Sequence, residues 1–420
     1  MGEFGFLWPL LRRRAGWLLV SLALALVTLV AGLGLLAVSG WLLAGAALAG
    51  LAATVSFELF RPAALVRLCA LSRTGGRYGE RVVSHEATFR LLADLRVWFY
   101  ARLAPLAPSS LQGFRSGELL NRLVADIQSL DNLFLRVLAP SVSAVCIGAG
   151  LYWLLGQWSW WWANAVVGCL ALAGVAVPAL AARLGASSGA ALSEELGRLR
   201  AELVETLQGL AEVLVYGAEK RRLQALTERE ARYLDLQRHM NRLQAGSAAL
   251  QTLLSGLALW AALFIGTELV ATGHLTGPLL AGLALTVLAA FEAVQPLPLA
   301  YQFLGQTRAS ARRLREVLDT PPTVVFPAHS ARLPTHFELM LRGVSFAYRP
   351  GEPPVLRDLD LCVPAGGRLA VMGPSGAGKS TLAQLLVRFF DPTSGMIHLG
   401  GVDLSSFAET DLRRLGGMVS

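Results

Sequence analysis

Residues 373–381 read GPSGAGKST, and this stretch decides how the last part of the chain folds. Its glycines, lysine and serine fit the pattern G-x-x-x-x-G-K-[ST], in which backbone N–H groups wrap a phosphate and a helix begins immediately afterwards. The apolar run Arg368–Met372 precedes the motif and predicts a strand, and STLAQLLVRFF predicts a helix after it. A strand–loop–helix order is the context that this phosphate-binding motif requires.

The motif gives individual residues a predicted role. We expect Lys379 to reach the β- and γ-phosphates of ATP and Ser380 to ligate Mg²⁺. Lys220 and Lys379 are the only lysines in a chain rich in arginine, and a compact ammonium suits this loop where a planar guanidinium would not. Tyr348 is a candidate platform for adenine, with packing on the core as the alternative. The predicted ATP-binding residues are Tyr348, Gly373, Pro374, Ser375, Gly376, Ala377, Gly378, Lys379, Ser380 and Thr381.

The chain as a whole is too apolar for a soluble protein. Its 420 residues are 54% hydrophobic and only 16% charged, with a mean hydropathy of +0.51, whereas soluble domains carry about 25% charged residues. The net charge is +8, but the arginines flank apolar stretches and do not interleave with aromatic residues. That distribution favours the positive-inside rule over nucleic-acid binding. The four cysteines are far apart, which argues against a zinc site or a disulfide framework.

Three apolar regions predict six membrane-spanning helices. A span needs roughly 20 residues, so the charge-free stretch 15–57 accommodates one span, an external turn and the start of a second. The charge-free stretch 137–182 predicts a hairpin whose outer turn is GQWSWWW (156–162), because indole rings favour the membrane interface. Region 243–300 is interrupted by ATGHLTGP (271–278) and predicts two more spans. The arginines at 12–14 place the N-terminus inside the cell.

The charged stretches between these regions, 58–136 and 183–242, are rich in helix formers. Helices of about 40 residues are about 60 Å long, twice the hydrocarbon core, so we expect long extensions into the cytoplasm. Prolines and short polar pieces at 321–335 mark a linker. We therefore predict a six-helix membrane domain at 1–320, this linker, and the first part of an α/β nucleotide-binding domain at 336–420.

The whole chain resembles a half-transporter of the ABC exporter family. The most specific part is FAYRPGEPPVLRDLDLCVPAGGRLAVMGPSGAGKSTL (346–382), followed by RFFDPTSGMIHLGGVDL (388–404). FRSGELLNRLVADI (114–127) is similar to the segment that follows the first cytoplasmic coupling turn of that family, and LQGLAEVLVYGAEKRR (207–222) resembles the segment around the second. The resemblance implies the type I ABC exporter fold, with an ATP-driven multi-pass protein in the bacterial inner membrane whose N-terminus and nucleotide-binding domain are cytoplasmic.

A narrower resemblance is to the CydC family, whose members pair with a homologous CydD subunit in an exporter needed for cytochrome bd assembly. Four segments carry it: SGWLLAGA (39–46), RTGGRYGERVVSHEATFRLL (73–92), GELLNRLVADI (117–127) and AAFEAVQPL (289–297). This resemblance implies a heterodimer that moves a small cargo, with cysteine, glutathione and haem as the associated molecules. A homodimeric lipid or drug exporter is the alternative within the same class.

In this family the ATPase domain extends beyond the position that corresponds to Ser420. The LSGGQ-type signature, the Walker B aspartate, the catalytic glutamate and the switch histidine are not found within residues 1–420. We therefore expect no catalytic residue within this range, and we expect the 420 residues alone to be inactive as an ATPase. The alternative from another class is a truncated, non-hydrolysing subunit that binds the membrane or a partner.

A charged stripe defines the candidate cargo site. Arg77, Arg81 and His85 follow the spacing i, i+4, i+8 and therefore share one side of a helix. An arginine facing lipid near mid-membrane costs about 3 kcal/mol, so the stripe faces either the cytoplasm or a polar cavity. In the cavity interpretation the arginines pair with an anionic cargo, and the resemblance to a haem-associated family makes His85 a candidate iron ligand.

Overall fold

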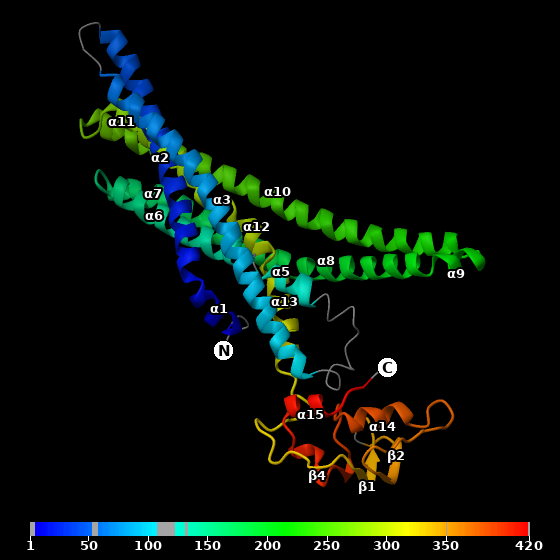
Figure 1. Cartoon of the computed structure of the whole chain (residues 1–420). Helices are drawn as coiled ribbons and strands as arrows, with labels where there is room; N and C mark the ends of the chain where they lie inside the picture. The colour runs from blue at the N-terminus through cyan, green and yellow to red at the C-terminus, as the bar shows by residue number, and fades with distance from the viewer. Residues whose placement is uncertain (1–4, 53–57, 107–121, 131–132, 350, 419–420) are drawn as a thin grey trace. The chain divides into compact units, whose positions relative to one another are not determined.

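The structure, a computed structural model, describes residues 5–52, 58–106, 122–130, 133–349 and 351–418 (Figure 1). The chain divides into two compact units. The first comprises Met1–Val97 and Asn121–Arg315, and the second comprises Trp98–Leu120 and Glu316–Ser420. The first eight residues of the segment 114–127 lie outside the described residues, so the expected first coupling segment is described only from residue 122 onward.

The first unit is helical, and two of its helices, α3 and α13, end in residues of the second unit. The principal helices are α1 (Trp8–Arg13), α2 (Ala15–Ala52), α3 (Phe60–Leu103), α6 (Ala139–Gly156), α7 (Trp160–Ala171), α8 (Val177–Gln208), α9 (Leu210–Val215), α10 (Glu219–Ala271), α11 (Gly277–Ala290), α12 (Leu297–Gln302) and α13 (Leu304–Leu318). Shorter pieces along the same part of the chain are η1 (Gly5–Leu7), η2 (Ala104–Leu106), η3 (Arg122–Asp126), α5 (Ile127–Ser129), η4 (Leu133–Leu138), η5 (Leu172–Ala176) and η6 (Phe291–Ala293).

Five helical segments in the described part of the chain are long and apolar enough to cross a membrane. They cover Ala15–Leu51, Arg122–Gly156, Trp160–Gln208, Glu219–Ala271 and Gly277–Gln302. Helix α3, where the sequence places another span, is not among them because it carries Arg61, Arg67, Arg73 and Arg77 in its first half. The count of six spans therefore stays a prediction.

The turns predicted at 156–162 and 271–278 are present in the structure, and their placement on the outer side of the membrane stays a prediction. Helix α6 ends at Gly156 and α7 begins at Trp160, so the tryptophan cluster lies at the turn of a hairpin. Ser159 caps α7 by accepting a hydrogen bond from the backbone N–H of Trp162, which satisfies one of the free donors at a helix start. The second turn lies between Ala271, the end of α10, and Gly277, the start of α11.

The core of this unit packs α6, α7, α10 and α11 together through buried aliphatic side chains, with Trp162 fully buried among them. Helix α2 packs closely against α11. A Cβ on Gly282 would lie 2.6 Å from the carbonyl oxygen of Ala37, and a Cβ on Gly40 would lie 2.9 Å from that of Ala281. These two glycines allow the helix backbones to approach, which is how helices associate in lipid.

The helix that begins with α11 is broken. It ends at Ala290, continues as η6 and a turn, and resumes as the short α12 at Leu297. Pro296 and Pro298 lie in this stretch, and proline removes backbone hydrogen bonds from a helix. Non-helical backbone at membrane depth is tolerated where it is buried in protein or lines a cavity.

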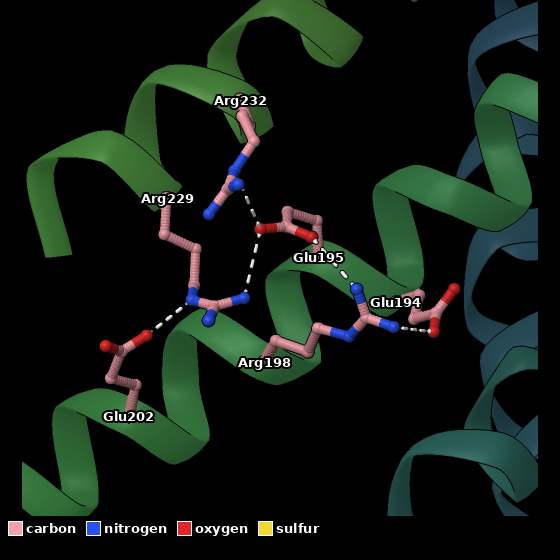
Figure 2. Close-up of polar contacts among 6 residues, drawn as sticks. All are labelled: Glu194, Glu195, Arg198, Glu202, Arg229 and Arg232. Carbon is pink, nitrogen blue, oxygen red and sulfur yellow. Dashed lines mark hydrogen bonds and ion pairs between the residues drawn. The ribbon is translucent and has the colours of Figure 1, made fainter. Parts of the chain in front are cut away.

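Helices α8 and α10 form the long hairpin that the charged stretch 183–242 predicts, with α9 at its tip (Figure 1). A cluster of charges joins the two helices (Figure 2). The carboxylate of Glu195 on α8 lies 3.7 Å from Arg198, 3.3 Å from Arg229 and 3.7 Å from Arg232. Arg229 also pairs with Glu202. Because the side chain of Glu195 is only 11% exposed, its charge is compensated mainly by these arginines.

The second unit contains an antiparallel sheet in the order β2–β1–β3–β4. The strands are β1 (Leu339–Phe346), β2 (Leu356–Val363), β3 (Ser394–Leu399) and β4 (Val402–Asp403), and they are accompanied by α14 (Lys379–Leu386), η7 (Leu404–Ser406) and α15 (Glu409–Leu415). Gly343 bulges from β1 with φ of 58°, a conformation that favours glycine. Buried side chains of the sheet, α14 and α15 form one core, with Phe407 fully buried.

The predicted strand at Arg368–Met372 is wrong. These residues form no strand in the described part of the chain, and Leu369, Val371 and Met372 are 52%, 48% and 88% exposed. An apolar run supplies strand propensity, but a strand also needs a hydrogen-bonded neighbour. The described sheet uses β1 and β3 for that pairing and leaves this run outside it.

Candidate nucleotide site and membrane cavity

The phosphate-binding motif folds as a loop that leads directly into α14. Gly376 and Gly378 have φ values of 84° and 87°, in the left-handed region that glycine adopts without strain. At Gly378 there is also no space for a side chain, since a Cβ would lie 2.9 Å from Leu356 Cδ2 and 3.2 Å from Val355 Cγ1. Backbone conformation therefore favours glycine at position 376, and conformation and close packing together require it at position 378.

Lys379 is the first residue of α14, and its side chain folds back over the loop. Its Nζ donates hydrogen bonds to the carbonyl oxygens of Gly373, at 2.9 Å, and Pro374, at 2.7 Å. Phosphate oxygens are stronger acceptors of a charged donor than peptide carbonyls. The backbone N–H groups at the start of α14 add positive potential. Ser380 is exposed at the next position of the helix. The donor set thus fits a nucleotide triphosphate with Mg²⁺.

Tyr348 lies just beyond β1 and reaches α14. Its hydroxyl is 2.9 Å from Oγ1 of Thr381. Its ring meets Phe346 and Phe390 edge-on, with centroids 5.0 and 5.5 Å away, and the residue is 41% exposed. The ring is therefore packed on the domain core and also open to solvent. The hydroxyl contact with Thr381 was not predictable from sequence, because it joins residues 33 positions apart.

The membrane unit contains a cavity of about 580 Å³ between α10 and the broken helix. Much of its lining is polar although the surrounding helices are apolar. The polar side chains are those of Gln244, Ser247, Gln251, Thr252, Ser255, Glu292 and Gln295. Gln251 is buried and donates a hydrogen bond to the carbonyl oxygen of Val294 at 2.9 Å, so it satisfies part of the backbone freed by the helix break.

Two arginines of α3 converge on the acidic residue of this cavity. Arg73 Nη2 lies 2.9 and 2.8 Å from the two carboxylate oxygens of Glu292, and Arg77 Nη2 lies 2.7 Å from one of them. The side chains of Arg73 and Glu292 are 29% and 32% exposed, and that of Arg77 is 57% exposed. The structure therefore brings Arg77, one of the predicted cargo residues, to the cavity's edge through Glu292.

The other two predicted cargo residues lie elsewhere on α3. Arg81 and His85 are exposed and are not among the residues that line the cavity. The ring of His85 lies 6.0 Å, centroid to centroid, from that of Phe89. Sequence reasoning missed Glu292 as a partner of the stripe, although the segment AAFEAVQPL carries one acidic residue inside an apolar region. An intramembrane charge of that kind is a signal for a buried partner.

Comparisons with known proteins agree with a helical membrane unit followed by a nucleotide-binding unit. The model of the ABC transporter transmembrane region matches residues 63–291, and the ABC transporter model matches residues 356–420. The fold is similar to that of a bacterial Atm1-family ABC exporter solved with ATP bound, with a TM-score of 0.74 and 24% identity, over 96% of this chain and 70% of that one. These matches define a multi-pass ABC transporter with the exporter fold that uses ATP and Mg²⁺.

Curated relatives identify the group of ABC transporters to which the chain belongs. The chain is 40% identical to the glutathione/L-cysteine transport system ATP-binding/permease protein CydC of Escherichia coli, over 96% of this chain and 71% of that protein. It is 34% identical to CydC of Haemophilus influenzae and 28% identical to CydD of Bacillus subtilis, over 69% and 68% of those proteins. The chain belongs to the ABC transporters and, within them, to the CydDC-type exporters.

Proposed function

We propose that the chain is one subunit of a heterodimeric exporter that uses ATP to move glutathione or L-cysteine out of the cytoplasm, with a CydD-like partner. The observation that carries the proposal is the 40% identity to the E. coli glutathione/L-cysteine transport protein, which extends over 96% of this chain. The proposed location is the bacterial inner membrane, with the N-terminus and nucleotide-binding domain on the cytoplasmic side. The arginines at 12–14, before α2, support that orientation.

The proposed domains are a membrane domain at 1–320, a linker at 321–335 and the first part of a nucleotide-binding domain at 336–420. The matched ranges of the two family models, 63–291 and 356–420, fall within the first and third of these. In this arrangement the long hairpin α8–α10, with the second coupling segment at its tip, transmits movement between nucleotide sites and membrane helices.

The residues of the phosphate loop have separate proposed roles. When bound, ATP would supply the phosphoryl group whose hydrolysis releases free energy, and Mg²⁺ would neutralise the charge of the phosphates. The backbone N–H groups of the loop and the start of α14 hold the phosphates, and Lys379 exchanges its two carbonyl partners for phosphate oxygens. Ser380 offers its hydroxyl to Mg²⁺, and Tyr348 presents the exposed part of its ring to adenine.

The test of this proposal is Lys379→Ala in the heterodimer, reconstituted in vesicles with its CydD-like partner. Among the described residues, the hydrogen bonds of the lysine side chain go to loop carbonyls, so we expect normal membrane insertion, at least tenfold weaker ATP binding and no export of radiolabelled glutathione or cysteine. Thr335→Ala, at an exposed residue of the linker, is the matched control and should behave as wild type. Unchanged ATP affinity and export in Lys379→Ala would contradict the assignment.

Lipid export and haem binding are the other cargo assignments that the family allows. The chain is 25% identical to an ATP-dependent lipid A-core flippase of Syntrophus aciditrophicus, over 59% of that protein, and this lower similarity makes a homodimeric lipid exporter the weaker candidate. Haem would require an axial ligand, for which His85 is the candidate residue.

A further inference from the structure

We propose that the cavity between α10 and the broken helix α11–η6–α12 binds the cargo, and that it selects a thiol peptide carrying one α-ammonium and two carboxylates. Arg73 and Arg77 would contact a carboxylate of this ligand and Glu292 its ammonium. Glutathione has this set of charges, whereas L-cysteine lacks the second carboxylate. The inference rests on the proposed function, because it names the ligand class of the exporter's own cargo site.

The position of the charges is the first argument. Arg73 lies beside the middle of the charge-free helix α2, since a Cβ on Gly32 would be 3.5 Å from its guanidinium carbon, and Glu292 is paired with Arg73. Helix α2 is long and apolar enough to cross a membrane, so this ion pair lies beside the middle of a candidate span. Ionisable residues at such depths face a bundle interior or a cavity and mark ligand pathways.

The charge balance is the second argument. Two guanidinium groups share the single carboxylate of Glu292, so the three residues carry a net charge of +1. The side chain of Arg77 is 57% exposed, so the excess positive charge is partly solvated and accessible to an anionic ligand. A ligand with a net charge of −1 neutralises the cluster, and glutathione at neutral pH has that charge. Cysteine, a zwitterion with no net charge, leaves the excess in place.

The cavity's polar walls are the third argument. Among the residues that the structure describes, Gln244 and Gln295 line the cavity and their side chains have no hydrogen-bond partner. Each amide offers donors and an acceptor that suit the peptide groups of a short peptide. The cavity volume of about 580 Å³ lies within the range of roughly 300–1,000 Å³ that is typical of small-molecule sites.

The helix break supplies a reason for the cavity's location. Breaking α11 at Phe291 turns Glu292 and Gln295 toward α10, and Gln251 holds the freed carbonyl of Val294. Discontinuous membrane helices recur at transport sites because their unpaired backbone and polar side chains can be solvated by a ligand. The same break would otherwise only weaken the bundle.

The experiment uses the heterodimer in vesicles and measures the concentration of each ligand that gives half-maximal stimulation of ATP hydrolysis. The ligands are glutathione, glutathione with its amino group acetylated, and L-cysteine. The variants are Glu292→Gln, Gln295→Ala and the control Arg67→Gln, which removes one exposed charge from the same helix without an ion pair in the described structure.

For the wild type we expect half-maximal stimulation at a lower concentration of glutathione than of either other ligand. Glu292→Gln should raise the value for glutathione roughly tenfold or more, as expected for a lost charge-assisted contact, and should remove the preference over the acetylated form. Gln295→Ala should raise it severalfold, and Arg67→Gln should not change it. Gln295→Ala keeps the inference testable if Glu292→Gln fails to assemble, because Gln295 is exposed and its side chain makes no hydrogen bond among the described residues.

Wild-type values and an unchanged preference in Glu292→Gln, or an unchanged value in Gln295→Ala, would overturn the inference while leaving the proposed function intact. A wild type that responds better to L-cysteine would overturn the charge argument. A wild-type heterodimer with Lys379-dependent ATP hydrolysis but no response to any thiol would contradict the proposed cargo itself.

Discussion

The hydroxyl group of Tyr348 lies 2.9 Å from Oγ1 of Thr381 and thereby ties the end of β1 to the first turn of α14. Thr381 is buried and belongs to the phosphate-binding motif. The tyrosine ring also packs edge-on against Phe346 and Phe390. Tyr348 therefore has two separable features, a hydroxyl that contacts the motif and a ring available to adenine.

Substitutions of Tyr348 separate these two features. If the ring stacks on adenine, Tyr348→Ala should weaken ATP binding roughly tenfold, since loss of base–aromatic stacking costs about 1–3 kcal/mol. Tyr348→Phe keeps the ring and should bind ATP nearly as well as the wild type, with a small loss of thermal stability from the missing hydroxyl contact. Titration with a fluorescent ATP analogue measures both affinities. Equal affinity in wild type and Tyr348→Ala would leave Tyr348 a packing residue only.

In the charge cluster of Figure 2, Glu195 is the carboxylate that contacts three arginines, while Glu202 pairs with Arg229 and Glu194 with Arg198. Glu195→Gln leaves the three guanidinium groups of Arg198, Arg229 and Arg232 without their shared partner. We expect a local destabilisation of roughly 1–3 kcal/mol, the cost of losing the charge in one hydrogen bond, to Arg229, and in two longer ion pairs at a poorly exposed site. Hydrogen–deuterium exchange should then be faster in residues 190–205 and 225–235.

Glu205→Gln is the control for this substitution. Glu205 lies on the same helix, but its side chain is 73% exposed and is 4.0 Å from Arg222. Exposed pairs of this kind contribute about 0–1 kcal/mol, so exchange in the hairpin should be unchanged. If the hairpin residues exchange hydrogen for deuterium at the same rate in Glu195→Gln and Glu205→Gln, the cluster does not stabilise the hairpin.

The helical hairpins and the phosphate loop were predictable from sequence because their signals are local. The tryptophan cluster at 156–162 and the charge-free flanks identify a membrane turn. In GPSGAGKST, Gly376 and Gly378 allow the positive φ angles that the loop conformation needs. The strand at Arg368–Met372 was predicted wrongly, because an apolar pattern reports propensity and does not report whether a neighbouring strand is present to pair with it.

The membrane cavity could not be predicted in the same way. Arg73 and Glu292 are 219 residues apart, and their contact depends on how α3 packs beside the broken helix. Sequence spacing placed Arg77, Arg81 and His85 on one side of a helix, but it did not identify which neighbouring residues that side contacts. The sequence analysis predicted no break in the second span of region 243–300, and the polar lining from α10 follows only from the packing.

Cys362 offers a pH-dependent test of the sheet's edge. Its thiol donates a hydrogen bond to Glu338 Oε1 at 3.3 Å. This bond, together with desolvation and the charge of Glu338, raises the pKa of Cys362 above its ordinary value. Because the thiolate is the reactive form, alkylation at pH 8 should be slow and should accelerate as the pH rises. Glu338→Gln removes the negative charge, lowers the pKa and should make alkylation at pH 8 faster.

The measurement is the rate of iodoacetamide labelling in a variant whose other three cysteines are replaced by serine. Cys69, Cys146 and Cys169 all lie in the membrane unit, so their replacement leaves the sheet unchanged. Asp360→Asn is the control, since its carboxylate accepts a hydrogen bond from the backbone N–H of Gly343 and not from the thiol. If labelling is equally fast with and without the Glu338 carboxylate, that carboxylate does not raise the pKa of the Cys362 thiol.

The stripe on α3 allows haem and thiol cargo to be distinguished. His85 is exposed and has Phe89 as its ring neighbour, so an iron ligated there would lie outside the cavity that contains Glu292. If His85 ligates haem, the heterodimer titrated with haem should show a Soret band that His85→Ala removes, while Arg81→Ala should weaken binding and leave the band position unchanged. His239→Ala, at another exposed histidine of a long helix, is the matched control. Identical spectra for the wild type and His85→Ala would leave the stripe as a solvated face. Loss of the band in His85→Ala with normal stimulation by glutathione would show that haem and thiol bind at different places on the same subunit.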